Sequence, residues 1–298
     1  LKVIMLVVFF AIMIGVGFYS RKQATDVNGF VLGGRSVGPW LTAFAYGTSY
    51  FSAVIFVGYA GQFGWKYGIA STWIGIGNAV LGSLIAWAVL GRRTRLITQK
   101  LDSRTMPEFF ERRYNSKSLK LVSSLIIFVF LIPYTASLYN GLSRLFGMAF
   151  EIDYKVCVIA MAALTGIYVI VGGYMATAIN DFIQGIIMLF GIVVVIAAVL
   201  KNYGGLTGAL DKLANVSDPA VSSTPGVFAS FLGPDIFNLV CVVILTSLGT
   251  WGLPQMVQKF YAIKDEKSIR TGTVVSTIFA VIVAGGCYFL GGFGRLTD

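Results

Sequence analysis

Residues 44–60, FAYGTSYFSAVIFVGYA, are the stretch that decides the fold of this chain. The stretch is apolar enough to cross a membrane, but one turn in its middle is crowded with small and polar residues: Gly47, Thr48, Ser49 and Ser52. A helix in hydrocarbon satisfies its backbone groups internally, so a break at membrane depth is tolerated only where it lines a cavity or a site. We therefore expect a broken helix whose carbonyl and hydroxyl groups bind something small.

The composition places this stretch in a polytopic membrane protein. Of the 298 residues, 56% are hydrophobic and 12% are charged, whereas soluble domains are usually about 25% charged. Several apolar runs exceed the roughly 20 residues that cross a bilayer. The chain contains no His, which is the commonest metal ligand, so neither a transition-metal site nor an organic cofactor is expected.

The apolar runs predict eight membrane spans. Their approximate limits are 3–20, 39–62, 68–90, 119–146, 154–172, 178–200, 228–258 and 270–292. Counted over alternate loops, 16 of the 23 Lys and Arg residues fall on one side. Loops rich in Lys and Arg stay in the cytoplasm, so the N-terminus is expected to face outward. This topology accounts for the net charge of +10 without a nucleic-acid partner.

The largest basic loop contains TMPEFFERRY at 105–114. Thr105 and Glu108 have the spacing of a capping box, and Pro107 falls in the first turn, where its missing N–H costs nothing. A short amphipathic helix on the membrane surface is expected here.

A second interruption lies in residues 245–259, LTSLGTWGLPQMVQK. Gly249, Gly252 and Pro254 break the seventh span, and Thr250 and Trp251 lie among them. This density of Gly and Pro predicts another broken helix. The alternative is a simple kink or a packing surface, because membrane helices tolerate Gly and small residues.

Asp181, in the sixth span, is the one acidic residue that the sequence places inside a span. Intramembrane ionisable groups are costly and usually mark an ion or proton path. The alternative is that Asp181 complements the helix dipole near the start of its helix. Gln184, one turn further on, favours a polar site that faces the bundle.

Two broken helices are typical of secondary transporters, which place them at matching positions of inverted repeats with the site between them. We expect an extra N-terminal helix at 1–22, a first five-helix repeat at 38–200, and the first two helices of an inverted second repeat at 227–298. A GxxxxGK motif is absent from the sequence, so ATP drive has no support. The HExxH and GxSxG patterns are also absent, and the chain is not expected to be an enzyme.

The sequence resembles the sodium:solute symporter family, whose members carry proline, pantothenate, sugars or sialic acid. The residues that carry the resemblance are LGGRSVG at 32–38, the first break, TMPEFFERRY, the run IYVIVGGYMATAINDFIQG at 167–185, and WGLPQMVQKF at 251–260. The resemblance implies an all-α membrane protein with the LeuT-type inverted-repeat fold and an extra N-terminal helix. It also implies that the second repeat is truncated here, and that a chain lacking the remaining helices would not transport alone.

The resemblance also implies a coupling ion. Family members hold a sodium ion partly by main-chain carbonyls at the first break, which match Thr48 and Phe51, and sodium prefers oxygen ligands. Some members have a further sodium site at the acid that matches Asp181. The other sodium ligands of the family lie on helices beyond this sequence.

The family's solute site lies between the two breaks. Its residues match Tyr50, Ser52, Thr250 and Trp251, with Thr72 and Trp73 as possible walls. Proline members carry an acid where Tyr50 stands, and sugar members carry polar residues where Val54 and Ile55 stand. Gly252-x-Pro254 is closer to the proline members, so an amino acid or carboxylate is favoured over a sugar.

The predicted function is Na+-coupled symport of a small organic solute by alternating access. The predicted location is a plasma membrane, of the bacterial inner-membrane kind. Two alternatives stay open: a membrane module that senses the solute, and a transporter coupled to protons at Asp181.

Overall fold

The computed structural model describes residues 2–52 and 54–296. Leu1, Ala53, Thr297 and Asp298 lie outside the described residues. The predicted segments 1–22 and 227–298 therefore begin and end, respectively, at residues that the structure does not describe. The described residues form helices and no named β-strand. The helices are α1 (Lys2–Ser20), α2 (Val27–Leu32), α3 (Pro39–Tyr50), α4 (Ala60–Tyr67), α5 (Thr72–Gly77), α6 (Arg92–Lys100), α7 (Met106–Tyr114), α8 (Lys117–Phe150), α9 (Tyr154–Asn202), α10 (Gly205–Ala214), α11 (Ile236–Leu248), α12 (Pro254–Ala262), α13 (Glu266–Ala280) and α14 (Gly286–Gly292).

Five helical runs among the described residues are long and apolar enough to cross a membrane. They are Ile4–Gln23, Ala60–Lys100, Lys117–Phe150, Tyr154–Asn202 and Glu266–Leu296. α11 is apolar but shorter, because a break separates it from α12.

The chain divides into two compact units. The first unit comprises Leu1–Ser49, Trp87–Gln184 and Gly252–Gly272, and the second comprises Tyr50–Ala86, Gly185–Trp251 and Thr273–Asp298. The chain therefore passes from one unit to the other five times. Two of these crossings coincide with the interruptions that the sequence predicts.

A buried apolar cluster at the end of α12 forms a core of the first unit. Its buried members are Leu32, Val37, Tyr174, Met175, Ala178, Tyr261 and Ala262. Two backbone hydrogen bonds fix this cluster: the Val37 N–H donates to Ala262 O at 3.3 Å, and the Lys264 N–H donates to Val37 O at 3.0 Å. The segment before α3 is thereby tied to the end of α12.

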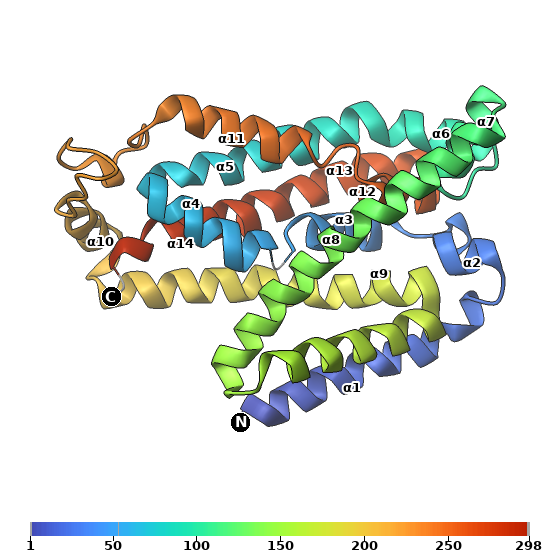
Figure 1. Cartoon of the computed structure of the whole chain (residues 1–298), viewed down its shortest axis with the longest axis horizontal. Coiled ribbons are helices and arrows are strands. Elements are labelled where there is room, and N and C mark those ends of the chain that lie inside the picture. Colours follow the sequence, from blue (N-terminus) through green and yellow to red (C-terminus); the bar gives the residue numbers. More distant parts are fainter. Residues whose placement is uncertain (1, 53, 297–298) are drawn as a thin grey trace. The chain divides into compact units, whose positions relative to one another are not determined.

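The fifth and sixth predicted spans are joined without a loop. α9 reverses at Gly173, whose φ of 57° and ψ of −150° lie outside the helical region, and residues 154–172 and 174–184 run in opposite directions (Figure 1). A side chain at Gly173 would meet the Phe30 backbone. The prediction that the sixth span begins near residue 178 is therefore wrong: its helix begins at Tyr174, and Asp181 lies two turns inside it.

Two other predicted limits are also corrected. The basic loop after residue 90 is shorter than expected, because helix α6 continues to Lys100. The seventh span begins at Ile236 rather than at 228, since the residues just before it form only a short 3-10 turn, Val227–Ala229.

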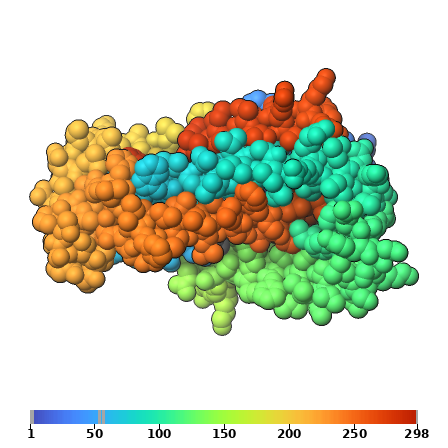
Figure 2. Space-filling view, turned by 90° about the horizontal axis from the view of Figure 1, so that it is seen from above, coloured from blue at the N-terminus to red at the C-terminus, as the bar shows by residue number. Residues whose placement is uncertain are grey.

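In the second unit, α11 lies beside the helical run formed by α5 and the π-helical stretch Asn78–Ile85 (Figures 1 and 2). A further π-helical stretch, Val281–Gly285, follows α13. Such wide turns often occur at functional sites. The buried hydroxyls of Ser83 and Ser276 are hydrogen-bonded at 2.8 Å and join the stretch Asn78–Ile85 to α13.

Two glycines allow α4 and α14 to pack backbone against backbone. A Cβ built on Gly64 would overlap the Gly291 carbonyl group, and a Cβ built on Gly291 would overlap the Ala60 carbonyl oxygen. Gly61, on the same helix as Gly64, has open space around it. Close approach of this kind is a common way for membrane helices to pack, since it brings dispersion contacts and weak hydrogen bonds into range.

The Gly64→Ala variant is expected to lower the free energy of unfolding by about 1–3 kcal/mol, as for other overpacked sites. The midpoint of thermal unfolding of the purified protein measures the effect. Gly61→Ala is the matched control, and it should leave the midpoint unchanged or raise it slightly, because Ala favours helix over Gly. Equal midpoints for the two variants would contradict the close packing of α4 on α14.

Candidate ion and solute site

The first break lies where the sequence predicts it. α3 ends at Tyr50, and Phe51 and Ser52 are not helical before the π-helical stretch Val54–Tyr59. The last four carbonyl groups of a helix have no partner within the helix. The end of α3 therefore presents carbonyl oxygens, including that of Thr48, at the break.

The second break is also confirmed. α11 ends at Leu248, a turn closed by a 3.1 Å bond from the Trp251 N–H to Leu248 O follows, and α12 begins at Pro254. Pro254 occupies the first turn of α12, where its missing N–H costs nothing. Leu253 before it is extended, with ψ of 127°.

Within the second unit, Tyr50 ties the two breaks together. Its hydroxyl donates to the Thr246 carbonyl oxygen at 2.9 Å, and its ring stacks on Phe51 at a centroid distance of 4.5 Å. Gly82 leaves room for this hydroxyl, because a Cβ there would overlap it. Phe51 is 1% exposed, so its side chain is packed in the interior, while its backbone carbonyl lies in the non-helical segment.

Asn78 is a polar site residue that the sequence analysis missed. It is fully buried, and its Oδ1 accepts hydrogen bonds from the hydroxyls of Thr246 at 2.9 Å and Ser247 at 3.0 Å. Its Nδ2 is buried without a hydrogen-bond partner. Asn78 is the one Asn in the predicted span 68–90. Because a buried amide in a membrane helix needs hydrogen-bond partners, this residue type could have pointed to Asn78 as a site residue.

The residues predicted to surround the solute all belong to the second unit, but they are not equally placed. Thr250 donates to Ser247 O at 2.9 Å, and the Trp251 indole donates to Leu81 O at 3.0 Å, so both lie beside Asn78 and its helix. Thr72 bonds locally to Ile69 O. Trp73 is 47% exposed and donates to Phe231 O at 3.0 Å.

Trp73 instead lines a separate apolar cavity of about 460 Å³ between α5 and α11. Thr72 and Trp73 precede Asn78 by more than one helical turn in the sequence. The structure thus bonds Tyr50 and Thr250 to α11, where Thr246 and Ser247 hold Asn78, and Trp251 to the helix of Asn78, whereas Trp73 lines a different cavity.

In the first unit, the structure brings Thr48 and Asp181 together. The Thr48 side chain lies near the Asp181 carboxylate, and its hydroxyl donates to Phe44 O at 2.9 Å. The Phe44 ring packs against Phe182 at 4.8 Å. Because Asp181 lies two turns inside its helix, the dipole explanation for it fails, since that effect fades within the first turn.

Lys259, on α12, is the second residue that the sequence analysis missed. Its Nζ lies 3.6 Å from Asp181 Oδ2 and 5.2 Å from the centre of the Tyr174 ring. Lys259 is 7% exposed. A buried ammonium needs a counter-charge, and Asp181 supplies it.

The neighbouring amides on α9 face α1 rather than this ion pair. Asn180 is buried and donates to Met13 O at 3.3 Å, and the Gln184 amide lies 3.3 Å from Met13 Sδ. They attach the N-terminal helix to the core of the first unit. Gln184 therefore does not share a polar site with Asp181, whose partner is Lys259.

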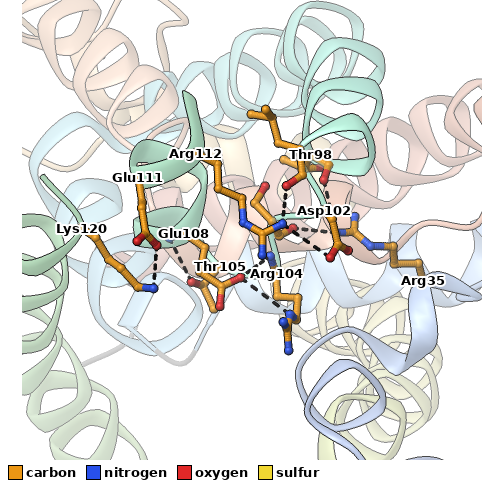
Figure 3. A network of polar contacts seen from close by, with 11 residues as sticks. Arg35, Thr98, Asp102, Arg104, Thr105, Glu108, Glu111, Arg112 and Lys120 are labelled. Atoms are coloured by element: carbon orange, nitrogen blue, oxygen red, sulfur yellow. Dashed lines mark hydrogen bonds and ion pairs between the residues drawn. The ribbon is translucent and has the colours of Figure 1, made fainter. Parts of the chain in front are cut away.

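A polar network in the first unit surrounds Arg35, Asp102 and Arg112 at the end of α6 (Figure 3), and further bonds from Arg35 and Arg95 reach the end of α12. The Arg35 guanidinium donates to Ser103 O at 2.6 Å and to Tyr261 O at 3.4 Å, and Arg95 donates to Lys264 O at 3.0 Å. Burial lowers the pKa of the Arg35 guanidinium, and Asp102 opposes that effect. The network thus fixes the loop after α6 to the backbone at the end of α12.

The predicted helix at 105–114 is confirmed and belongs to this network. Thr105 Oγ1 accepts from the Glu108 N–H at 3.4 Å. Glu108 Oε2 accepts from the Arg104 N–H at 2.8 Å rather than from Thr105, as the capping box would require. Lys120 pairs with Glu111 at 2.6 Å and joins α7 to α8.

A transition-metal centre is not evident in residues 2–52 and 54–296, where no group of three or more Cys, Asp or Glu side chains is placed to hold a metal. The polar groups at the breaks are oxygens of carbonyls, hydroxyls and one carboxylate, which suit a hard cation. Helices interrupted at membrane depth and lined by such groups define a class of protein, the helical membrane transporters with discontinuous helices.

Residues 30–295 match the sequence model of the sodium:solute symporter family. The chain belongs to this family, which is one of transporters. It is 30% identical over 295 residues to the osmoregulated proline transporter OpuE of Bacillus subtilis (98% of this chain and 58% of that protein). It is 36% identical over 270 residues to a sodium/proline symporter of Staphylococcus aureus (89% and 51%).

A solved structure of a Na+-coupled sialic acid symporter, substrate-bound and outward-open, superposes with a TM-score of 0.76 at 19% identity. The superposition covers 96% of this chain and 58% of that protein, so the chain has the LeuT-type fold that the resemblance implies. The chain spans about half to three fifths of the length of these relatives.

Replacing Asn78 with Leu is expected to reduce the free energy of unfolding by about 1–3 kcal/mol, because the Thr246 and Ser247 hydroxyls lose a buried acceptor. Thermal unfolding of the purified variant measures the loss. Asn202→Leu, at an exposed position near the end of α9, is the control and should cost little. An Asn78 variant as stable as the control would show that the amide does not hold α11 against its neighbour.

Proposed function

We propose that the protein is a Na+-coupled symporter that imports a small organic solute by alternating access across a bacterial plasma membrane, with its N-terminus outside. The observation that carries the proposal is the pair of broken helices whose polar groups converge on Asn78 in the second unit. A helix that gives up backbone hydrogen bonds at membrane depth needs a ligand or a water-filled cavity to compensate.

The solute is proposed to bind at Ser52, Thr250 and Trp251, with Tyr50 as the residue that keeps the two breaks together. The unpaired Asn78 amide donor suits a carboxylate oxygen, which accepts hydrogen bonds. Thr72 stays a proposed outer wall, and Trp73 has the weakest support because it faces another cavity.

A small amino acid or carboxylate is favoured over a sugar. The relatives at 30% and 36% identity are named as proline transporters, and the Gly252-x-Pro254 pattern of the second break agrees with them. Proline is therefore the first solute to test.

The coupling ion is proposed to be Na+, held at one site by the carbonyl groups of Thr48 and Phe51 and at a further site by the Asp181 carboxylate. Support comes from the end of α3, which leaves carbonyls without helical partners, and from the closeness of the Thr48 side chain to the Asp181 carboxylate. The ion and the solute would then use the same broken helix.

Alternating access is supported by the way the units divide the chain. The first broken helix passes between units at Ser49 and Tyr50, and the second at Trp251 and Gly252. Non-helical residues at such points can absorb the backbone changes that accompany a rearrangement.

We expect the full-length protein in proteoliposomes to accumulate labelled proline when an inward Na+ gradient is imposed. Dissipating that gradient with a sodium ionophore should stop accumulation, because uphill movement then has no source of free energy. An inward K+ gradient of equal size is the control. Accumulation that follows a pH gradient without Na+ would indicate proton coupling, and binding without accumulation would indicate a sensing module.

The Asp181→Asn variant is expected to raise the Na+ concentration for half-maximal uptake by roughly tenfold or more. A hydrogen bond or contact to a charged group is worth about 1.5–3 kcal/mol, and about 1.4 kcal/mol is a factor of ten. A Na+ titration of proline uptake measures this shift. Asp211→Asn, at an exposed position on α10, should leave the Na+ dependence unchanged; an unchanged value for Asp181→Asn would count against its sodium role.

A further inference from the structure

We propose that Lys259 is a tethered counter-cation of Asp181, which Na+ displaces when it binds and which returns to the carboxylate when Na+ leaves. This inference rests on the proposed sodium role of Asp181 and adds Lys259, a residue of the 251–260 motif to which the sequence analysis gave no role. The side chain that competes with Na+ for Asp181 is then Lys259 on α12.

The first observation is that the carboxylate already has a cationic partner. Lys259 Nζ lies 3.6 Å from Asp181 Oδ2. Two cations at one carboxylate repel each other, and at a short distance in a protein interior this repulsion is far larger than in water. Na+ and the ammonium therefore compete for Asp181 rather than share it.

The second observation is the environment of the lysine. Its side chain is 9% exposed, whereas the Asp181 side chain is 23% exposed. The carboxylate is thus the more accessible member of the pair, so an arriving ion reaches it more readily than it reaches the ammonium.

The third observation is that the ammonium already has a second attractive partner beside Asp181. The Tyr174 ring lies 5.2 Å from Nζ, and the face of an aromatic ring attracts a cation by about 0.5–2 kcal/mol. A displaced ammonium can therefore move toward Tyr174 without leaving the site. Lysine suits this role because its ammonium is a point charge on a flexible stem.

The consequence concerns α12. Lys259 lies on this helix, whose end is fixed by the bonds from Arg35 and Arg95 to Tyr261 and Lys264. When Na+ takes over Asp181, α12 loses its ion pair with α9 but keeps these backbone bonds. Ion binding thereby changes how strongly α12 is held against α9. A ligand shifts the balance between two conformations only if it interacts differently with each of them, and the loss of this ion pair is such a difference.

Binding of labelled Na+ to the purified full-length protein tests the inference. In Lys259→Met the competitor is gone, so the half-saturating Na+ concentration should fall by roughly tenfold or more, which corresponds to about 1.4 kcal/mol. Lys259→Arg keeps a positive charge and should stay close to the parent protein. Lys264→Met is the matched control, because Lys264 is half-exposed and contacts Asp265 rather than Asp181; it should change the value by less than about twofold, since exposed charge pairs are weak.

The outcomes separate the inference from the proposed function. If Asp181→Asn abolishes Na+ binding but Lys259→Met binds Na+ like the parent, the counter-cation role is overturned and the sodium site stands. Na+ binding that is insensitive to Asp181→Asn overturns both. A Lys259→Met effect matched by Lys264→Met would reflect only a general loss of positive charge and also overturns the inference.

A measurement on the unmodified protein covers the case in which Lys259→Met does not fold. Release of the ammonium from its ion pair should make Lys259 react faster with a small amine-directed acylating reagent in Na+ than in choline at equal ionic strength. Mass spectrometry of the modified peptides measures the rate at Lys259, with Lys264 as the internal reference. Equal rates at Lys259 in both salts would overturn the displacement.

Discussion

The structure depends on one constraint: inside hydrocarbon, a backbone or side-chain polar group without a partner costs several kcal/mol. Two helices of this chain nevertheless stop at membrane depth, at Tyr50 and at Leu248. The second unit meets the cost with contacts between these breaks and the helix beside them. Tyr50 bonds to Thr246 O, and Asn78 accepts the hydroxyls of Thr246 and Ser247.

The same constraint explains the kinds of residues at the site. The groups that face the breaks are carbonyls, hydroxyls and amides, which can pair among themselves and also with a small ion or solute. The single carboxylate, Asp181, is instead paired with Lys259 in the first unit. Among the described residues near the breaks, charge is thus confined to this ion pair.

Glycines decide how closely the helices approach. Gly64 and Gly291 let α4 and α14 meet with their backbones in contact, and Gly173 reverses α9 without a loop. The reversal has a functional consequence, because it starts the following helix at Tyr174 and places Asp181 beyond the reach of the helix dipole. A local backbone feature therefore removes the helix-dipole explanation for Asp181.

The sequence by itself determined the membrane class, both helix breaks and the cap of α7. These follow from local rules, since apolar length, Gly–Pro clusters and capping spacing act over a few residues. The tertiary structure alone decided the partners of Asn78 and Asp181, since Asn78 and Thr246 are 168 residues apart, and Lys259 lies on another helix from Asp181. It also decided the placement of Trp73 away from the solute group. Which distant segments meet depends on packing of the whole chain, and no local spacing encodes it.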